Sequence, residues 1–386
     1  MTIVCLGYRK GFAEAARLRG QPLHFIVEKV KPAIDRFDHT KVSDLADTEE
    51  VLRAVSEAVP AGVTAVVTGH EQAVFTAALL RSVIGLPGDT DVLRCLRFRD
   101  KRIQKRSVSS SIPRARCEYL PLATPRYPEL ADRLGASIVV KPADGHGSQA
   151  THLVTGQADL DDYFARHPLV SDVQTVAESF VEGDEIHVDG VWIRGEPLWT
   201  AVSKYTGPLM GWTDGTAVGD APLGPAEREL SERASEFAAE VLSDLAAPDT
   251  VFHLEAFVQP GGELVLGEVA ARTAGALTPE VLRLTHGIDL YGAALDLALG
   301  RTPELPAPSS GPGRLFGWIY LTREPDQDLS EESFRSRFDL VELSYPDSAA
   351  GRTGSYGRWG HAIIGAPTHE QLMRELRAIA EFSRGA

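Results

Sequence analysis

The chain has 386 residues, of which 43% are hydrophobic and 24% are charged, and its formal net charge is −15. This length predicts two or three domains, and the composition is typical of a globular enzyme. The acidic balance argues against a nucleic acid or an anionic membrane surface as the main partner. The three cysteines, Cys5, Cys95 and Cys117, match no zinc or disulfide pattern. We therefore expect reduced thiols and a cytoplasmic location.

Strand-like and helical segments alternate through residues 1 to 95, which predicts a small α/β domain with a parallel sheet. The expected strands are 2–7, 23–28 and 63–69, and the expected helices are 11–20, 47–59 and 71–85. The N-terminus therefore reads as a strand followed by a helix, and not as a signal peptide. The stretch "GYRKGF" lacks the G-x-G-x-x-G spacing, so a dinucleotide site is not expected there.

The alternation of strand-like and helical segments ends near residue 95. Six Lys or Arg side chains between Arg97 and Arg106 indicate a basic helix, whose simplest interpretation is a solvated face. From about residue 173 the alternation is typical of antiparallel strands, and a long helix is expected at 226–245. Residues 305–386 predict a small α+β appendage with two strands and a closing helix.

A predicted hairpin between residues 250 and 272 indicates a metal site. Gly261 and Gly262 predict a two-residue turn, and pairing outward from it places Glu255 opposite Glu268. Two facing carboxylates repel unless a cation lies between them, and carboxylate oxygens bind Mg²⁺. The alternative is a solvated face that tolerates both acids. The same alternation puts His253 and Leu266 on the face of the two acids.

The stretch "SIVVKPADGHGSQATHLV", residues 137–154, places a lysine in front of glycines. The common phosphate loop has the opposite order and opens a helix. Here Lys141 ends a strand, and the following residues predict a flap whose backbone can fold over a triphosphate and is mobile without it.

These motifs together resemble the ATP-grasp superfamily, and among its members the microbial amino-acid and peptide ligases. The resemblance covers nearly the whole chain. It implies a mixed α/β and α+β fold with an N-terminal Rossmann-like domain (1–95) and an ATP-grasp domain (96–304). The smaller lobe of that domain would span about 100–172 and the larger about 173–304, followed by the C-terminal subdomain (305–386).

The resemblance also implies roles for particular residues. The lysines of "RDK" (residues 99–101) and "VVKPADGHGSQA" would hold phosphates, the segment "ESFVEGDE" would bind adenine and ribose, and the hairpin acids would bind metal. The implied nucleotide-binding residues are Lys101, Lys141, Gly145, His146, Gly147, Ser148, Glu178, Ser179, Val181 and Glu185. The implied metal ligands are Glu255 and Glu268, holding one or two Mg²⁺, or Mn²⁺. The implied catalytic residues are Lys204, reaching the γ-phosphate, His253, and Arg272, binding the carboxylate or the acylphosphate.

Two positions depart from the pattern of the superfamily. Ala270 stands where an Asn ligand of a second metal is common, and His253 stands where Arg is common. The departure at Ala270 leaves the number of metals open, because water would have to replace the missing amide.

The implied activity is ligation of a carboxylate to an amine through an acylphosphate, with ATP as the energy source. Loading of a carrier-protein thiol, carboxylation, and nucleotide sensing without catalysis remain alternatives. The expected partners are small-molecule substrates, with a homodimer as the default assembly. Further candidates are His70 and Glu71 at a strand end, His187 and Asp189 on the strand of Glu185, and a substrate loop at 205–223 with Met210, Trp212 and Asp214.

Overall fold

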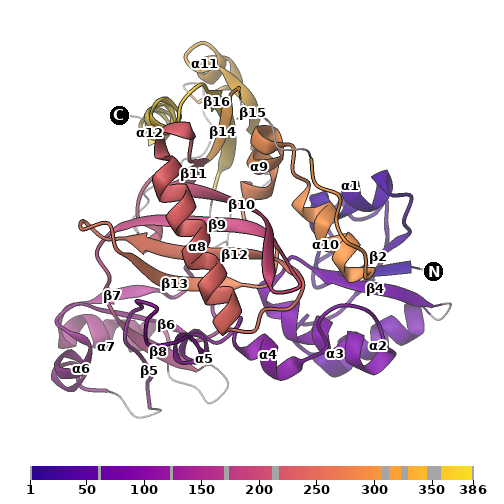
Figure 1. Cartoon of the computed structure of the whole chain (residues 1–386), viewed down its shortest axis with the longest axis horizontal. Helices are drawn as coiled ribbons and strands as arrows, with labels where there is room; N and C mark the ends of the chain where they lie inside the picture. The colour runs from indigo at the N-terminus through magenta and orange to yellow at the C-terminus, as the bar shows by residue number, and fades with distance from the viewer. Residues whose placement is uncertain are drawn as a thin grey trace.

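The computed structural model describes residues 2–59, 62–121, 125–168, 174–210, 217–306, 313–322, 329–345 and 358–384. Within these ranges the strands form three sheets (Figure 1). No helix of the described residues is long and apolar enough to cross a membrane.

The N-terminal sheet is parallel, as predicted, with the order β3-β2-β1-β4. Its buried strands are rich in β-branched side chains, and helices cover both faces. The strands are β1 (Thr2–Leu6), β2 (Leu23–Val27), β3 (Asp38–Lys41) and β4 (Val63–Thr68). The helices are α1 (Lys10–Leu18), α2 (Thr48–Ala58), the short η1 (Glu71–Ala73), α3 (Val74–Ile84) and α4 (Val92–Leu96).

The second sheet is antiparallel, with the order β5-β8-β6-β7. Its strands are β5 (Cys117–Tyr119), β6 (Ile138–Pro142), β7 (His152–Val154) and β8 (Thr175–Ser179), and its helices are α5 (Lys101–Ser107), α6 (Tyr127–Leu134) and α7 (Gln157–Arg166). Because β8 pairs with β6, the smaller sheet extends beyond residue 172, where the sequence places the boundary between the lobes.

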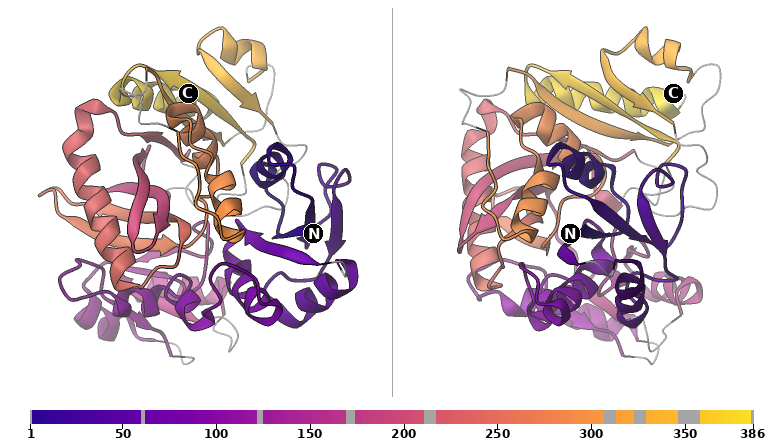
Figure 2. Two further views of the ribbon diagram at one scale, coloured as in Figure 1. Left: turned by 45° about the vertical axis from the view of Figure 1, so that its right-hand side comes forward. Right: turned by 90° about the vertical axis from the view of Figure 1, so that its right-hand side faces the viewer.

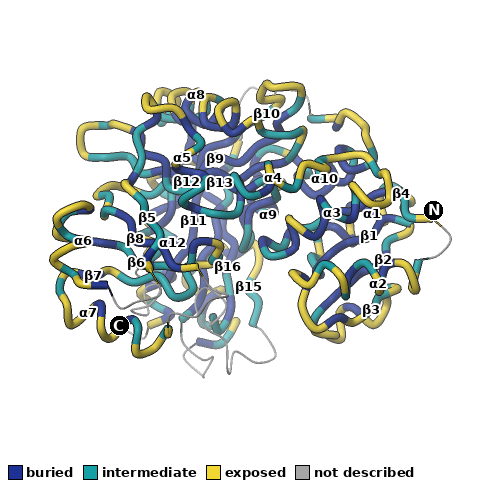
Figure 3. Tube along the Cα trace, turned by 90° about the horizontal axis from the view of Figure 1, so that it is seen from below, coloured by how far each residue is buried: buried dark blue, intermediate teal, exposed yellow. Residues whose placement is uncertain are grey.

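The third sheet has eight strands in the order β13-β12-β9-β10-β11-β14-β16-β15. The long helix α8 (Arg228–Asp244) packs on it through one apolar face, and its other face is exposed (Figure 3). The strands are β9 (Asp184–Ile193), β10 (Glu196–Tyr205), β11 (Gly219–Pro222), β12 (Thr250–Val258), β13 (Leu264–Ala270), β14 (Leu315–Leu321), β15 (Leu340–Ser344) and β16 (Gly360–Ala366). The other helical segments are η3 (Pro225–Glu227), α9 (Thr278–His286), α10 (Leu290–Ala298), α11 (Glu331–Arg335) and α12 (His369–Arg384).

The C-terminal strands belong to this large sheet, because β11 pairs with β14 through Gly219 opposite Ile319 and Asp220 opposite Trp318. The segment expected as an appendage therefore continues the sheet that carries the metal hairpin. The division of the chain into domains at residues 95 and 304 stays a prediction.

Helix α10 lies beside α1 of the N-terminal sheet (Figures 1 and 2). The rings of Phe12 and Tyr291 meet edge to face with centroids 5.0 Å apart. Arg19 forms ion pairs with Asp289 at 3.2 Å and Asp296 at 3.1 Å. The other side of α10 packs against the large sheet. A single helix therefore joins the two sheets.

The hairpin β12–β13 differs from the expected two-residue turn. Gln259 donates its N–H to Glu263 O (2.9 Å), and Gly262, with φ of +83°, follows Pro260 and Gly261 in a three-residue loop. This loop shifts the pairing by one residue near the turn, so Val258 faces Leu264.

A bulge at Gly267 then restores the register beyond it, and Glu255 faces Glu268 as predicted. A Cβ atom on Gly267 would lie 2.9 Å from Glu255 O, so a side chain does not fit there. The bulge also explains why the expected face of Leu266 is wrong: this side chain joins the buried core cluster.

Candidate functional site

A pocket of about 350 Å³ opens among the three sheets. Its lining includes Arg9 and His70 after N-terminal strands, Lys141 at the end of β6, and Glu255 and Glu268 from the hairpin. Carboxyl ends of parallel strands are common ligand sites, and here they face the strands of both antiparallel sheets. The sequence motifs of distant segments therefore meet in one place.

One buried and one half-buried lysine flank a buried carboxylate at the pocket. Glu178 on β8 accepts from Lys105 Nζ and Lys141 Nζ, each at 2.8 Å. Burial opposes the charged form of Glu178, yet the two ammonium groups lower its pKa to about 2. Burial likewise opposes the charge on Lys141, but Glu178 raises the pKa of that lysine above its ordinary value. Lys141 therefore stays cationic, and the shared carboxylate fixes the direction of both lysine side chains.

Helix α5 brings Lys101 to the glycine-bearing loop. Asp100 caps the helix by accepting from the N–H groups of Arg102 and Ile103, at 2.9 and 2.8 Å. Lys101 Nζ then donates to Gly145 O at 2.7 Å and lies 3.3 Å from Glu268 Oε1. This lysine is only 4% exposed, so the expected solvated face of the basic helix is wrong for Lys101, and also for Lys105. Their ammonium groups turn inward to carboxylates and carbonyls.

The facing acids of the hairpin lie at the same end of the pocket. Glu255 Oε1 accepts from Tyr205 Oη at 3.0 Å and from His253 Nε2 at 3.3 Å. Burial raises the pKa of Glu255, but these partners and the nearby histidines outweigh it and lower the pKa to about 2. The carboxylate is thus ionised, and with Glu268 it offers the oxygen ligands that Mg²⁺ prefers.

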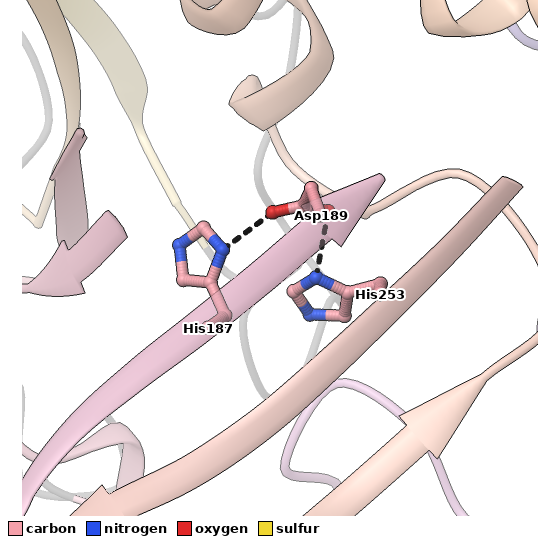
Figure 4. A group of neighbouring side chains, drawn as sticks. All are labelled: His187, Asp189 and His253. Carbon is pink, nitrogen blue, oxygen red and sulfur yellow. Dashed lines mark hydrogen bonds and ion pairs between the residues drawn. The ribbon is translucent and has the colours of Figure 1, made fainter. Parts of the chain in front are cut away.

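A chain of hydrogen bonds extends from Glu255 into the large sheet, and Figure 4 shows its middle part, His187, Asp189 and His253. His253 Nδ1 bonds Asp189 Oδ1 at 3.0 Å, and Asp189 Oδ2 bonds His187 Nδ1 at 2.6 Å. His187 Nε2 bonds Asp220 Oδ2 at 3.1 Å, and that oxygen also accepts from Trp318 Nε1 at 2.7 Å. We call this set, from Glu255 to Trp318, the polar chain.

Both histidines of the polar chain lie between carboxylates. Although burial favours the neutral ring, the flanking acids raise the pKa of His187 to about 10 and that of His253 to about 9. The sequence places His187 and Asp189 as partners of the site or contacts of a substrate. The structure assigns them to hydrogen bonds within the sheet, and both side chains are fully buried.

An arginine pair surrounds Glu71 in the lining of the pocket. The Glu71 carboxylate forms ion pairs with Arg272 and, at 3.1 Å, with Arg99. Burial opposes its charge, but Arg272 and Arg99 lower the pKa of Glu71 below its ordinary value. Arg99 Nη2 also donates to Asp144 O at 2.9 Å in the glycine-bearing loop. Glu71 therefore orients Arg272 toward the pocket, which both side chains line.

Comparisons with known proteins give relatives and matching structures. No family model matches the sequence. The L-arginine-specific L-amino acid ligase of Bacillus subtilis is 25% identical over 249 residues, which are 62% of this chain and 59% of that protein. Carnosine synthase 1 of Mus musculus is 26% identical over 369 residues, which are 87% of this chain and 44% of that protein. The chain thus spans about half the length of these relatives.

Two solved structures match the chain from end to end. The L-amino acid ligase from Bacillus licheniformis has a TM-score of 0.73 at 18% identity, over 98% of this chain and 97% of that one. Carboxyaminoimidazole ribonucleotide synthase from Aspergillus clavatus, complexed with ATP, has a TM-score of 0.76 at 17% identity, over 99% and 98%. The chain therefore has the fold of these enzymes, as the sequence motifs predict. At these identities the likeness of the structures establishes the ATP-grasp fold.

Most residues expected from the ATP-grasp pattern do line the pocket. They are Lys101, Lys141, Gly145, His146, Gly147, Ser148, Glu178, Ser179, Val181, Glu185, His253, Glu255, Glu268 and Arg272. Their roles toward nucleotide or metal remain predictions. The flap formed by residues 144–150 has positive φ at Gly147, Ser148 and Ala150, and its mobility also stays a prediction.

The structure contradicts the expectation for Lys204. This residue pairs with Ile186, whose side chain is in the core under α8, whereas the adjacent Tyr205 lines the pocket. Because neighbouring side chains of a strand alternate between faces, Lys204 points away from the site. Its ammonium instead bonds Asp184 at 2.7 Å.

Two expected adenine contacts need revision in detail. The Glu178 carboxylate, expected to meet the adenine amino group, is engaged by both lysines. Ser179 N–H donates to Arg116 O at 2.9 Å.

Glu185 accepts from Leu209 N–H at 3.0 Å, and burial raises its pKa to about 7. Met210 lines the pocket, while Trp212 and Asp214 lie outside the described residues.

Several residues in or next to the pocket lining escaped the sequence reasoning. Lys105 lies four residues after Lys101, so helical spacing places both on one face of α5 and was a usable signal. The position of Tyr205 in the pocket lining follows from the same alternation of side chains along the strand that turns Lys204 away from the pocket. Arg9, and Arg358 with its guanidinium 4.2 Å from the Tyr320 ring centroid, come from segments without any motif.

Proposed function

We propose that this protein is an ATP-dependent carboxylate–amine ligase, which activates the carboxylate of an amino acid and joins it to an amine. The observation that carries the proposal is the placing of Glu255 opposite Glu268 in the pocket that also holds Lys101, Lys141 and the flap. The names of the relatives, an L-amino acid ligase and a carnosine synthase, support amino-acid substrates.

The cationic end of the pocket would bind the triphosphate of ATP. Lys101 and Lys141 are held by neighbouring carboxylates and carbonyls, so their charges are oriented before the nucleotide arrives. The flap would close over the phosphates through its backbone, because its glycines allow close approach. Glu185 would accept from the ribose hydroxyls, and the backbone of residues 178–181 would meet the adenine.

The metal would be Mg²⁺ held by Glu255 and Glu268, and it would neutralise charge on the phosphoryl oxygens during transfer. Two carboxylates facing each other from adjacent strands are a donor set that suits this hard cation. The matching protein from Aspergillus clavatus is complexed with ATP, which supports nucleotide binding by a chain of this fold.

Arg272 would bind the carboxylate that is activated. Its Nε is engaged by Glu71 and its Nη1 donates to Thr273 O at 2.7 Å, so the guanidinium has a fixed orientation at the pocket. The carboxylate would attack the γ-phosphate and release ADP, and the resulting acylphosphate would react with the amine and release phosphate. Arg9 and Arg358 add positive charge to the pocket lining and favour substrates that carry a further carboxylate.

A phosphate-release screen tests the proposal. The protein is incubated with ATP, Mg²⁺ and single or paired amino acids, including arginine and β-alanine with histidine, and products are identified by mass. Phosphate release that requires two amino acids, with a product lighter than their sum by one water, is the expected result.

The Glu268→Ala variant is the control for the metal assignment, and we expect it to form no ADP. Normal turnover by this variant would refute the metal site. Turnover that requires a pantetheine thiol or bicarbonate in place of an amine would refute the ligase and favour thiol loading or carboxylation. A cytoplasmic location and a homodimer stay predictions.

A further inference from the structure

We propose that Glu255 and Glu268 together hold one divalent cation per chain. His253 contacts the Glu255 oxygen that a second cation would need as a ligand, so that oxygen is already engaged by the protein. This inference rests on the proposed function and concerns the metal site of the same pocket. It follows from which oxygens of the two acids the protein itself already engages.

Each acid has one oxygen bonded by the protein and one without a partner among the described residues. On Glu255, Oε1 accepts from Tyr205 Oη and His253 Nε2, at 3.0 and 3.3 Å. On Glu268, Oε1 lies 3.3 Å from Lys101 Nζ. The two Oε2 atoms therefore remain as ligands, one from each strand. Such a pair suits a single cation whose other positions are filled by phosphate and water.

His253 cannot easily leave Glu255, because the polar chain fixes it from behind. Its Nδ1 bonds Asp189, and Asp189 in turn bonds His187 (Figure 4). Turning the ring away would leave the fully buried Asp189 carboxylate with an unmet hydrogen bond, which is costly in a low-dielectric interior. The bond from His253 to Glu255 is thus a permanent part of the site.

His187, Asp189 and His253 could themselves be considered as metal ligands, since their ligand atoms lie within 4.8 Å of one another. Their geometry argues against it. Each Nδ1 faces a different oxygen of Asp189, and each Nε2 faces another carboxylate, Asp220 or Glu255. Both nitrogens of each ring are thus engaged by carboxylates, so neither ring has a free nitrogen directed at a shared metal position.

The residue facing His253 supplies no ligand. Ala270 lies directly opposite His253 in the ladder, so the two departures from the superfamily pattern are cross-strand neighbours. Cβ atoms of such a pair are about 4.5–5.5 Å apart. A methyl group there offers no oxygen, and both ring nitrogens of His253 opposite are already engaged by Asp189 and Glu255. A second divalent ion would meet both disadvantages at once.

Counting protein-bound Mn²⁺ tests the inference. The full chain is dialysed against Mn²⁺ and adenylyl imidodiphosphate, an ATP analogue that is not hydrolysed, and bound Mn²⁺ is measured by paramagnetic resonance. We expect one Mn²⁺ per chain. The double variant His253→Gln/Ala270→Asn frees Glu255 Oε1 from the histidine and adds an amide oxygen. It should bind a second Mn²⁺, with an affinity at least tenfold lower than that of the first.

The single variant Ala270→Asn is the matched control and should stay at one Mn²⁺, since His253 still holds Glu255. Two Mn²⁺ in the wild type would overturn the inference, and so would one Mn²⁺ in a folded double variant. If the double variant does not fold by circular dichroism, the wild-type count and the single variant still decide. Failure of the wild type to bind the analogue, measured separately by calorimetry, would refute the proposed function instead.

Discussion

Replacing Glu178 by glutamine is expected to destabilise the folded chain by about 3 kcal/mol at pH 7. The carboxylate is 5% exposed and holds two ammonium groups, each at 2.8 Å. Despite burial, these neighbours lower its pKa from an ordinary 4.5 to about 2. That difference corresponds to roughly 3–4 kcal/mol at about 1.4 kcal/mol per pKa unit, within the loss of roughly 3–5 kcal/mol that breaking a buried ion pair causes.

The dependence on pH has a defined sign. Because the pKa of Glu178 is lower in the folded state, its contribution is complete above about pH 4.5 and is lost as the pH falls toward 2. The difference in unfolding free energy between wild type and Glu178→Gln should therefore be constant from about pH 5 to pH 8 and shrink at lower pH.

Urea unfolding, followed by circular dichroism, measures this difference, and thermal melting serves as a second readout because several sheets need not unfold together. Glu129→Gln, at an exposed ion pair on α6, is the control and should change stability by less than about 0.5 kcal/mol. The double variant Glu178→Gln/Lys105→Met should recover part of the loss, since it removes one of the two uncompensated charges. A Glu178→Gln protein as stable as the wild type at pH 7, or a difference that widens in acid, would refute the reasoning.

Three further outcomes are expected. In the phosphate-release assay, Lys204→Ala should form ADP at a rate within about threefold of the wild type. The rate for Lys141→Ala should fall at least about a hundredfold, since of these two lysines only Lys141 faces the pocket. Equal losses of rate would show that Lys204 belongs to the site. Glu71→Gln should raise KM for the carboxylate substrate about tenfold and leave KM for ATP nearly unchanged, because the substitution releases Arg272 but not Lys101 or Lys141. A variant in which only KM for ATP changes would contradict this. The affinity for ATP should rise between pH 6 and 8 as Glu185, with a pKa of about 7, becomes a carboxylate, and Glu185→Gln should abolish that rise in a titration by calorimetry.

Local patterns in the sequence predict most of the elements and the facing acids. The pairing of Glu255 with Glu268 holds although the expected turn is wrong, because the longer loop and the bulge at Gly267 compensate each other. A pattern of period two cannot reveal such a pair of irregularities, since each depends on backbone conformations at individual glycines. The correct result here rests partly on their cancellation.

Contacts between distant segments lie beyond such patterns. The partners of Glu178 and Glu71 come from a helix or a strand end far away in the chain, so their pairing follows only from how the sheets meet. The buried state of Lys101 and Lys105 has the same origin, because a basic helix looks solvated until an acidic partner is in place. Lys204 differs, since the strand alternation that excludes it was already readable in the sequence.

Helix α10 determines which parts of this chain could be exchanged with a relative. Its Tyr291 ring lies against Gly11, where a Cβ atom would come within 2.0 Å of it, and its acids bind Arg19. A chimaera that takes only residues 1–95 from another protein would therefore leave a foreign helix surface against α1. Residues 289–298 must therefore come from the same protein as residues 1–95. The N-terminal sheet and this helix have to be exchanged together, despite their distance in sequence.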